Sequence, residues 1–201
     1  MNRLSSSIRW VSLAFQGCFL SLIFLICLAG NAHAQTEGAP HKALGIEFQA
    51  YPTGIMPGLR FDLGLGAQSS VNLRLGLNIL DHRDLGVQDD ENGIGFGGSL
   101  GYRYHMSSNK AKWFGGIRAD LWFNEVDWED ESGRDEALKG TTNIIVFQPT
   151  VEAGYIFSLG DKGWYFTPNL SFGFEINVKT DGEEVGEGAV LLVGFSFGKR
   201  F

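Results

Sequence analysis

The residues with the clearest catalytic potential are His105 and Ser107, which a single residue separates. A histidine that accepts the proton of a serine hydroxyl activates this hydroxyl for ester hydrolysis, and a carboxylate orients the histidine. Glu125 or Glu152 would have to supply the carboxylate, but the sequence places neither of them beside His105. A lone His-x-Ser pair is also common by chance. We therefore predict no catalytic site, with ester hydrolysis as the alternative.

Ten charged residues form a second set, because all of them occupy polar positions in stretches that alternate between apolar and polar residues. Every basic member is an arginine, whereas the seven lysines lie in connections or at strand ends. The planar guanidinium group of arginine suits pairing with carboxylates in partly desolvated surroundings. The pattern predicts a buried ion-pair network, with a solvated, salt-bridged face as the alternative. Its members are Glu47, Arg60, Asp62, Arg74, Arg103, Arg118, Asp120, Glu152, Glu175 and Arg200.

Other residue types that bind ligands do not form a recognisable site. His41 and His82 are isolated, and the glycines around Gly97 lie in a strand-like stretch that no helix follows, unlike a phosphate-binding loop. The acidic connections lack the ordered spacing of a calcium motif. We therefore predict no metal site and no cofactor. The formal net charge of −7 and the lack of a basic cluster also exclude a nucleic-acid partner.

The first 34 residues have the composition of a cleavable secretory signal peptide. Arg3 and Arg9 precede an apolar run, and Ala32-His33-Ala34 fits the small-x-small cleavage pattern. Both cysteines lie in this segment, so cleavage leaves a chain without thiols. An uncleaved membrane anchor is the alternative. Residues 35–42 are predicted to be a loose tail, and residues 43–201 a single domain.

The domain alternates between apolar and polar residues with a period of two, which predicts strands with one apolar face. Short turns alternate with longer acidic connections along the chain. The first connection, Pro52–Pro57, is short, but its place in this alternation assigns it to the end of the barrel that has the long connections. Pro149 and Pro168 interrupt two strands, where we expect bulges. The eight strands are predicted at Ala43–Tyr51, Gly58–Gly66, Val71–Leu80, Gly93–His105, Lys112–Val126, Asn143–Phe157, Trp164–Val178 and Ala189–Phe201.

The alternation allows either face to point outward. A soluble lipocalin-like barrel directs its apolar face inward, and a membrane barrel directs it outward. A polar face whose basic residues are all arginines favours a polar interior. Aromatic residues also gather near the strand ends, as they do in the interfacial belts of membrane barrels. One belt would contain Tyr102, Tyr104, Trp113, Tyr155, Phe157, Trp164 and Phe201, and the other Tyr51 and Trp128.

With these features the chain resembles small eight-stranded outer-membrane β-barrels, of the kind seen in OmpX and in the barrel half of OmpA. The most specific local feature is the last strand, which ends in Phe201 and carries Phe195 and Phe197. It looks like the signal that this family presents to the barrel-assembly machinery. The resemblance implies an all-β, antiparallel, up-and-down transmembrane barrel in the outer membrane of a Gram-negative bacterium. A small outer-membrane lipid A deacylase also contains a His-x-Ser pair.

An eight-stranded barrel is only wide enough for its own inward side chains, so we expect a plugged interior without an open pore. The expected role is structural or surface-interacting. The expected partners are outer-membrane lipids, lipopolysaccharide and the assembly machinery, and the chain is expected to be a monomer. Divalent cations that bridge the acidic loops to lipopolysaccharide are an alternative to solvated loops. Alternative functions are a lipid-modifying enzyme of the deacylase kind, a soluble periplasmic lipocalin-like binder and a narrow channel.

Overall fold

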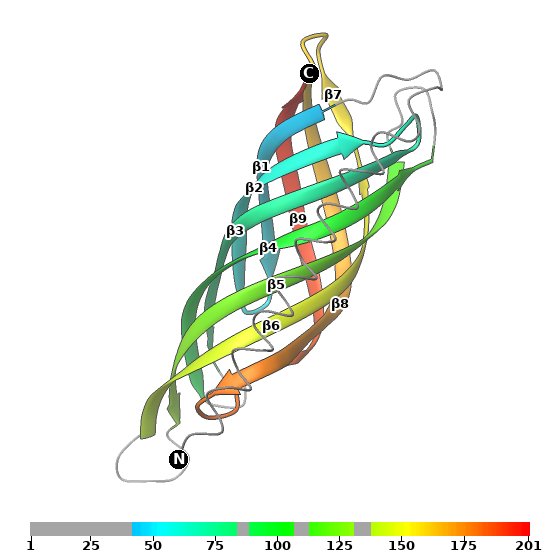
Figure 1. Ribbon diagram of the computed structural model, residues 1–201. Helices are drawn as coiled ribbons and strands as arrows, with labels where there is room; N and C mark the ends of the chain where they lie inside the picture. The colour runs from blue at the N-terminus through cyan, green and yellow to red at the C-terminus, as the bar shows by residue number, and fades with distance from the viewer. Residues whose placement is uncertain (1–41, 84–88, 107–112, 131–137) are drawn as a thin grey trace, which may run out of the picture. The chain divides into compact units, whose positions relative to one another are not determined.

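A computed structural model describes residues 42–83, 89–106, 113–130 and 138–201 of the chain, and these residues are almost entirely in antiparallel β-strands (Figure 1). No helix long and apolar enough to span a bilayer occurs among these residues. The strands are β1 (Lys42–Tyr51), β2 (Gly54–Gly64), β3 (Ser69–Arg83), β4 (Asp90–His105), β5 (Trp113–Asp130), β6 (Leu138–Tyr155), β7 (Phe157–Leu159), β8 (Trp164–Asp181) and β9 (Gly188–Arg200).

The sheet closes on itself. Consecutive strands pair from β1 to β6, β8 pairs with β6, β7 and β9, and β9 returns to pair with β1. The short strand β7 continues β6 along the same edge of β8 after a break at Ile156, so the nine segments form eight strand positions. The predicted fold, a closed eight-stranded antiparallel barrel with up-and-down connections, is confirmed.

The first connection differs from the prediction. The segment Pro52–Pro57 is not a loop, because β2 already begins at Gly54 and only Pro52 and Thr53 remain between the strands. Met56 pairs with Gln49, which extends the β1–β2 ladder toward the turn. The first strand begins at Lys42, one residue before the predicted barrel boundary. The predicted signal peptide and residues 35–41 of the tail lie outside the described residues.

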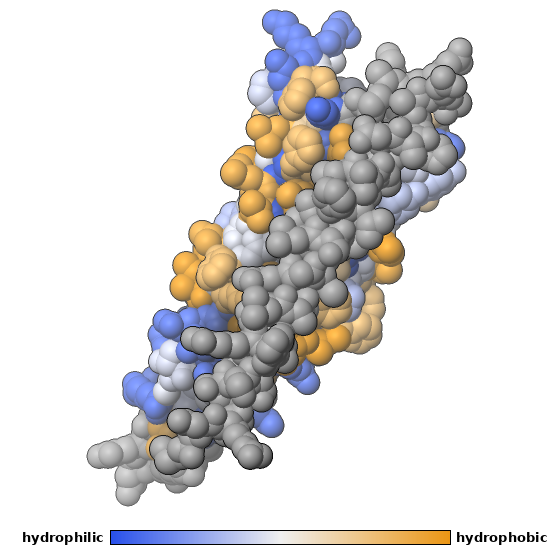
Figure 2. Space-filling view, in the orientation of Figure 1, coloured by the Kyte–Doolittle hydropathy of each residue, from blue (hydrophilic) through white to orange (hydrophobic). Residues whose placement is uncertain are grey.

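The two faces of the barrel have opposite polarity. Arg74 is 1% exposed, whereas its neighbour Leu75 is 62% exposed, and this alternation recurs along every long strand. Figure 2 shows hydrophobic side chains over the middle of the barrel and hydrophilic ones toward its ends. The predicted polar interior and apolar exterior are confirmed. The lipocalin-like arrangement is wrong, because a soluble barrel would bury this apolar face.

The end of the barrel that contains the β2–β3 turn, the β7–β8 turn and the C-terminus is called the turn end here, and the opposite end the loop end (Figure 1). Exterior aromatic side chains cluster at the turn end, where the Trp113 and Tyr155 rings are 4.9 Å apart. The predicted second belt is wrong. Tyr51 points into the barrel, where its hydroxyl donates to Asn78 Oδ1 at 2.6 Å, and Trp128 donates to Thr142 Oγ1 at 3.1 Å.

The two prolines explain interruptions in the ladders around β8. Pro149 keeps its register with Ala119 of β5, but the pairing of β6 with β8 is broken beside it, between Phe147 and Thr150. Pro168 pairs with Phe195 of β9, and opposite Pro168 the ladder is broken between β6 and β7. Each proline therefore lacks an N–H donor on the side that faces the seam between β8 and the β6–β7 edge, and the ladder is interrupted there. The bulge in the seam lies elsewhere, between Ile145 and Val146.

Candidate functional site

The polar interior contains four arginines, one on each of β2, β3, β4 and β5. Strand periodicity directs all of them inward, because they occupy the face opposite to the apolar exterior residues. Four carboxylates from β1, β2, β5 and β6 lie among them, so the charges balance. All eight are at most 9% exposed: Arg60, Arg74, Arg103, Arg118, Glu47, Asp62, Asp120 and Glu152. We call them the lumen network.

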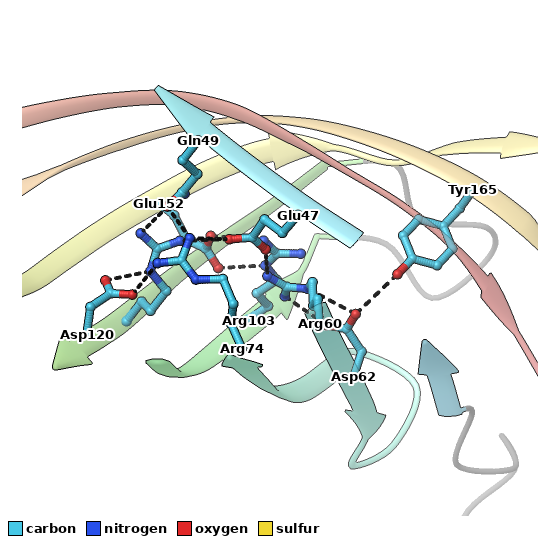
Figure 3. Close-up of polar contacts among 10 residues, drawn as sticks. Glu47, Gln49, Arg60, Asp62, Arg74, Arg103, Asp120, Glu152 and Tyr165 are labelled. Carbon is cyan, nitrogen blue, oxygen red and sulfur yellow. Dashed lines mark hydrogen bonds and ion pairs between the residues drawn. The ribbon is translucent and has the colours of Figure 1, made fainter. Parts of the chain in front are cut away.

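Glu47 of β1 is the centre of the lumen network (Figure 3). Its carboxylate accepts from Arg60, from Arg74 Nη1 at 3.1 Å and from Arg118 Nη1 at 3.3 Å. Arg60 and Arg74 are directly opposite each other on adjacent strands, an arrangement that repulsion would disfavour. The carboxylate that both arginines share offsets this repulsion.

A second carboxylate joins two of the same arginines. Asp120 accepts from Arg74 Nη2 at 2.7 Å and from Arg118 Nε at 2.9 Å. Gln49 Oε1 accepts from the same two arginines, at 2.6 Å and 2.9 Å. Side chains that start on β1, β3 and β5 therefore meet in the lumen and tie separate parts of the wall together.

Two further pairs complete the lumen network. Arg103 and Glu152 form a two-pronged ion pair, with Nε to Oε1 at 2.6 Å and Nη2 to Oε2 at 2.9 Å. The Arg103 guanidinium also lies 4.1 Å from the centre of the Phe114 ring. Asp62 pairs with Arg60 at 2.7 Å and accepts from the Tyr165 hydroxyl at 3.4 Å. The carboxylates are thus engaged by cations, which suits cross-linking of the wall more than acid–base chemistry.

Two of the ten predicted network residues lie apart from the other eight. Glu175 accepts a 3.4 Å hydrogen bond from Gln148 Nε2, and no lysine or arginine of the described chain forms an ion pair with it. Arg200 lies near the C-terminus with its guanidinium 5.4 Å from the centre of the Tyr165 ring. The structure therefore brings together eight of the predicted residues and separates the last two.

The interior also contains an apolar section that the alternation did not predict. Toward the loop end, nine buried hydrophobic side chains form one cluster beside buried polar side chains such as Asn78 and Asn124. Its signal in the sequence is a loss of alternation, because both faces are apolar in the runs Leu121–Phe123, Ile144–Phe147 and Val190–Val193. The members are Tyr51, Met56, Trp122, Val126, Ile144, Val146, Val185, Val190 and Leu192.

The residues considered for ester hydrolysis do not assemble within the described structure. His105 is buried, and its Nε2 lies 3.0 Å from Ser70 Oγ, whereas Ser107 lies outside the described residues. Glu152 is paired with Arg103, and Glu125 is exposed on the outer face. Within the same described ranges, no group of three or more histidines, cysteines or acids is arranged to hold a metal.

The aromatic residues of the predicted assembly signal lie on the exterior. The Phe195 ring is 5.8 Å from that of Phe48 and 5.6 Å from that of Phe166. Phe197 stacks on Trp164 at 5.3 Å, and Phe201 is 70% exposed. The last strand therefore presents these rings outward along the seam that closes the barrel, where β9 pairs with β1.

No protein-family model matches the chain, and no curated protein matches its sequence. Solved structures similar to it include the N-terminal β-barrel domain of Pseudomonas aeruginosa OprF, at 15% identity over 79% of this chain and 96% of that chain, with a TM-score of 0.41. Neisserial surface protein A matches at 8% identity over 81% and 96%, with a TM-score of 0.44. Outer membrane protein AlkL matches at 12% identity over 85% and 95%, with a TM-score of 0.49. The pairing of its own strands and the polarity of its two faces give this chain the fold of small eight-stranded outer-membrane β-barrels.

Proposed function

We propose that this protein is an outer-membrane barrel with a closed lumen, and that it serves the cell envelope in a structural or surface-interacting role. The apolar exterior supports the location. Leu59, Leu75 and Phe96 are each more than 60% exposed in the middle of their strands, where only hydrocarbon would cover them favourably. Each of the eight long strands pairs with a neighbour on both sides, so these ladders satisfy their backbone groups without water.

The lumen network supports the absence of an open pore. Ionic side chains from five successive strands, β1 to β5, meet across the lumen, and β6 contributes Glu152. An ion that crossed the barrel would have to displace guanidinium groups from carboxylates that hold them at 2.6–3.3 Å. Breaking such a buried pair costs about 3–5 kcal/mol. The lumen network therefore works as a plug made from the wall itself.

Phe195, Phe197 and Phe201 serve as the signal for the assembly machinery, lipids and lipopolysaccharide surround the exterior, and the barrel acts as a monomer. The proposal includes no catalytic role and no cofactor. An export signal in residues 1–34 would deliver the chain across the inner membrane of a Gram-negative cell.

Location is tested by cell fractionation combined with gel mobility. A membrane barrel is expected in the outer-membrane fraction, and its unheated form migrates differently from the boiled form. Recovery of the protein in the soluble periplasmic fraction, without detergent, would contradict the proposal.

Closure of the lumen is tested by single-channel recording in planar bilayers. We expect no conductance steps from the wild-type protein. The double variant Arg74→Ser/Arg118→Ser leaves Asp120 without a cation and opens space beside it, so cation-selective steps are expected. A matched control, Lys139→Ser/Glu129→Ser, removes an exposed ion pair and should stay silent. Steady ion-selective steps from the wild type would refute a closed lumen.

A further inference from the structure

The loop-end half of the barrel encloses a cavity of about 190 Å³ that the lumen network does not fill. Four aliphatic side chains from β5, β6 and β9 make up much of its apolar wall, namely Val126, Ile144, Val146 and Val190. All four are at most 6% exposed. An apolar cavity of about 150 Å³ accepts a single aromatic ring, so a cavity of this size has room for one.

The same cavity is acidic. Glu91, Glu175 and Glu187 line it, and no lysine or arginine is among the described residues that line it. Glu187 accepts from the backbone N–H of Asn177 at 3.0 Å. Glu175 has one long contact, the 3.4 Å hydrogen bond from Gln148, and no ion pair in the described part of the chain. A carboxylate in partly desolvated surroundings without a cation gains most from a cationic ligand.

The connection between β8 and β9 closes one side of the cavity. Its residue Val185 is 4% exposed and belongs to the apolar cluster, although it lies in a loop. Asn177 Nδ2 donates to the Val185 carbonyl oxygen at 3.2 Å, and Thr142 Oγ1 donates to that of Glu183 at 3.2 Å. The loop is therefore held against the barrel mouth, with Val185 directed inward as a wall residue.

We propose that this loop-end cavity binds a small organic cation that has an ammonium group and an apolar body of one ring or a short chain. Charge complementarity selects the ligand, because the ammonium group would pair with Glu175 while the body lies against the valine and isoleucine wall. A neutral molecule of the same shape would gain only the apolar contacts. An anion would meet the carboxylates of Glu175 and Glu187, and none of the described lining residues is a lysine or arginine. The proposal is independent of the lumen network, which lies nearer the turn end than the cavity and supplies none of the described lining residues.

The test is isothermal titration calorimetry of the full mature protein, folded in a non-ionic detergent. The ligands are 2-phenylethylammonium and its neutral counterpart 2-phenylethanol. We expect saturable one-to-one binding of the cation, with about ten-fold or greater preference over the alcohol, as for a hydrogen bond to a charged group. Glu175→Gln should remove this preference and leave binding of the alcohol unchanged.

Two further variants separate the cavity from general charge effects. Glu125→Gln removes the same charge from the exposed outer face and should bind the cation as the wild type does. Val185→Trp places a large side chain from the loop into the cavity and should abolish binding of both ligands. Gel mobility shows whether each variant is folded.

Equal affinity of the wild type for the cation and the alcohol would overturn the proposal, and so would the absence of saturable binding. Neither comparison depends on whether Glu175→Gln folds. Unchanged cation binding by folded Glu175→Gln would overturn it as well. The conductance and fractionation results decide the proposed function separately, because neither measures occupancy of the cavity.

Discussion

Removing one member of the Arg103–Glu152 pair should strongly destabilise the barrel. In Arg103→Met the guanidinium is lost, and the Glu152 carboxylate stays in the lumen with its side chain 0% exposed. Both of its oxygens lose their donors, which lie at 2.6 Å and 2.9 Å in the wild type. No other cation of the described chain forms an ion pair with Glu152.

The expected loss in the free energy of unfolding is about 3–5 kcal/mol, the cost of leaving a buried charge without its partner. The assay is equilibrium unfolding in urea of the protein folded in detergent, followed by tryptophan fluorescence and by gel mobility. The double variant Arg103→Met/Glu152→Met removes both charges and replaces them with flexible apolar side chains. It should recover most of the loss, because an apolar pair can replace a buried ion pair at little cost.

Lys139 provides the control, because its side chain is 66% exposed while it forms an ion pair with Glu129. Lys139→Met should change the free energy of unfolding by less than about 1 kcal/mol. If Arg103→Met were as stable as Lys139→Met, the pair could not be desolvated. If the double variant were no more stable than Arg103→Met, the loss could not come from an unpaired carboxylate, and the explanation would fail.

Three other substitutions test the exterior, the apolar cluster and the loop-end connection by unfolding in urea, the first in lipid bilayers and the other two in detergent. Leu75→Arg places a charge in the middle of the exposed apolar face and should lower the free energy of unfolding by about 2–4 kcal/mol in a bilayer. The control Glu125→Arg, near a strand end, should lower it by about 1 kcal/mol or less. Equal losses for the two variants would contradict a membrane-facing exterior. Trp122→Ala empties a site that is 0% exposed and should cost about 3–5 kcal/mol, so a near-neutral result would mean that the cluster is not packed. Gly182 has a φ of +137°, and a Cβ there would lie 2.6 Å from Thr142 Oγ1, so Gly182→Ala should cost more than Gly188→Ala, where φ is +145° and the space is open.

The strands and their inward residues were predictable because both depend on neighbouring residues. In Val71–Leu80 the side chains alternate strictly, so the inward direction of Arg74 and the outward direction of Leu75 follow from strand geometry. The errors lie where alternation is weak or ends. The predicted loop Pro52–Pro57 proved to be mostly strand, because the Met56–Gln49 pairing outweighs the turn tendency of its prolines.

The partners within the lumen network were not predictable. Arg118 reaches Glu47, which is 71 positions away, and Arg74 reaches Asp120, which is 46 positions away. These pairs depend on the stagger between strands and on how many strands close the barrel, which no local pattern specifies. For the same reason Glu175 and Arg200, which share the inward register of the others, lie outside the network.

The sequence alone determined the class of the protein, since a period of two with arginines on one face and aliphatic residues on the other suits a barrel with a polar interior and an apolar exterior. Only the tertiary structure decided which charges meet, that an apolar cluster forms in the loop-end interior, and that a cavity remains there in which Glu175 has no ion pair with a described residue. The physical reason is that side-chain direction is a property of each strand, whereas contacts across a lumen arise only when distant strands have closed into one wall.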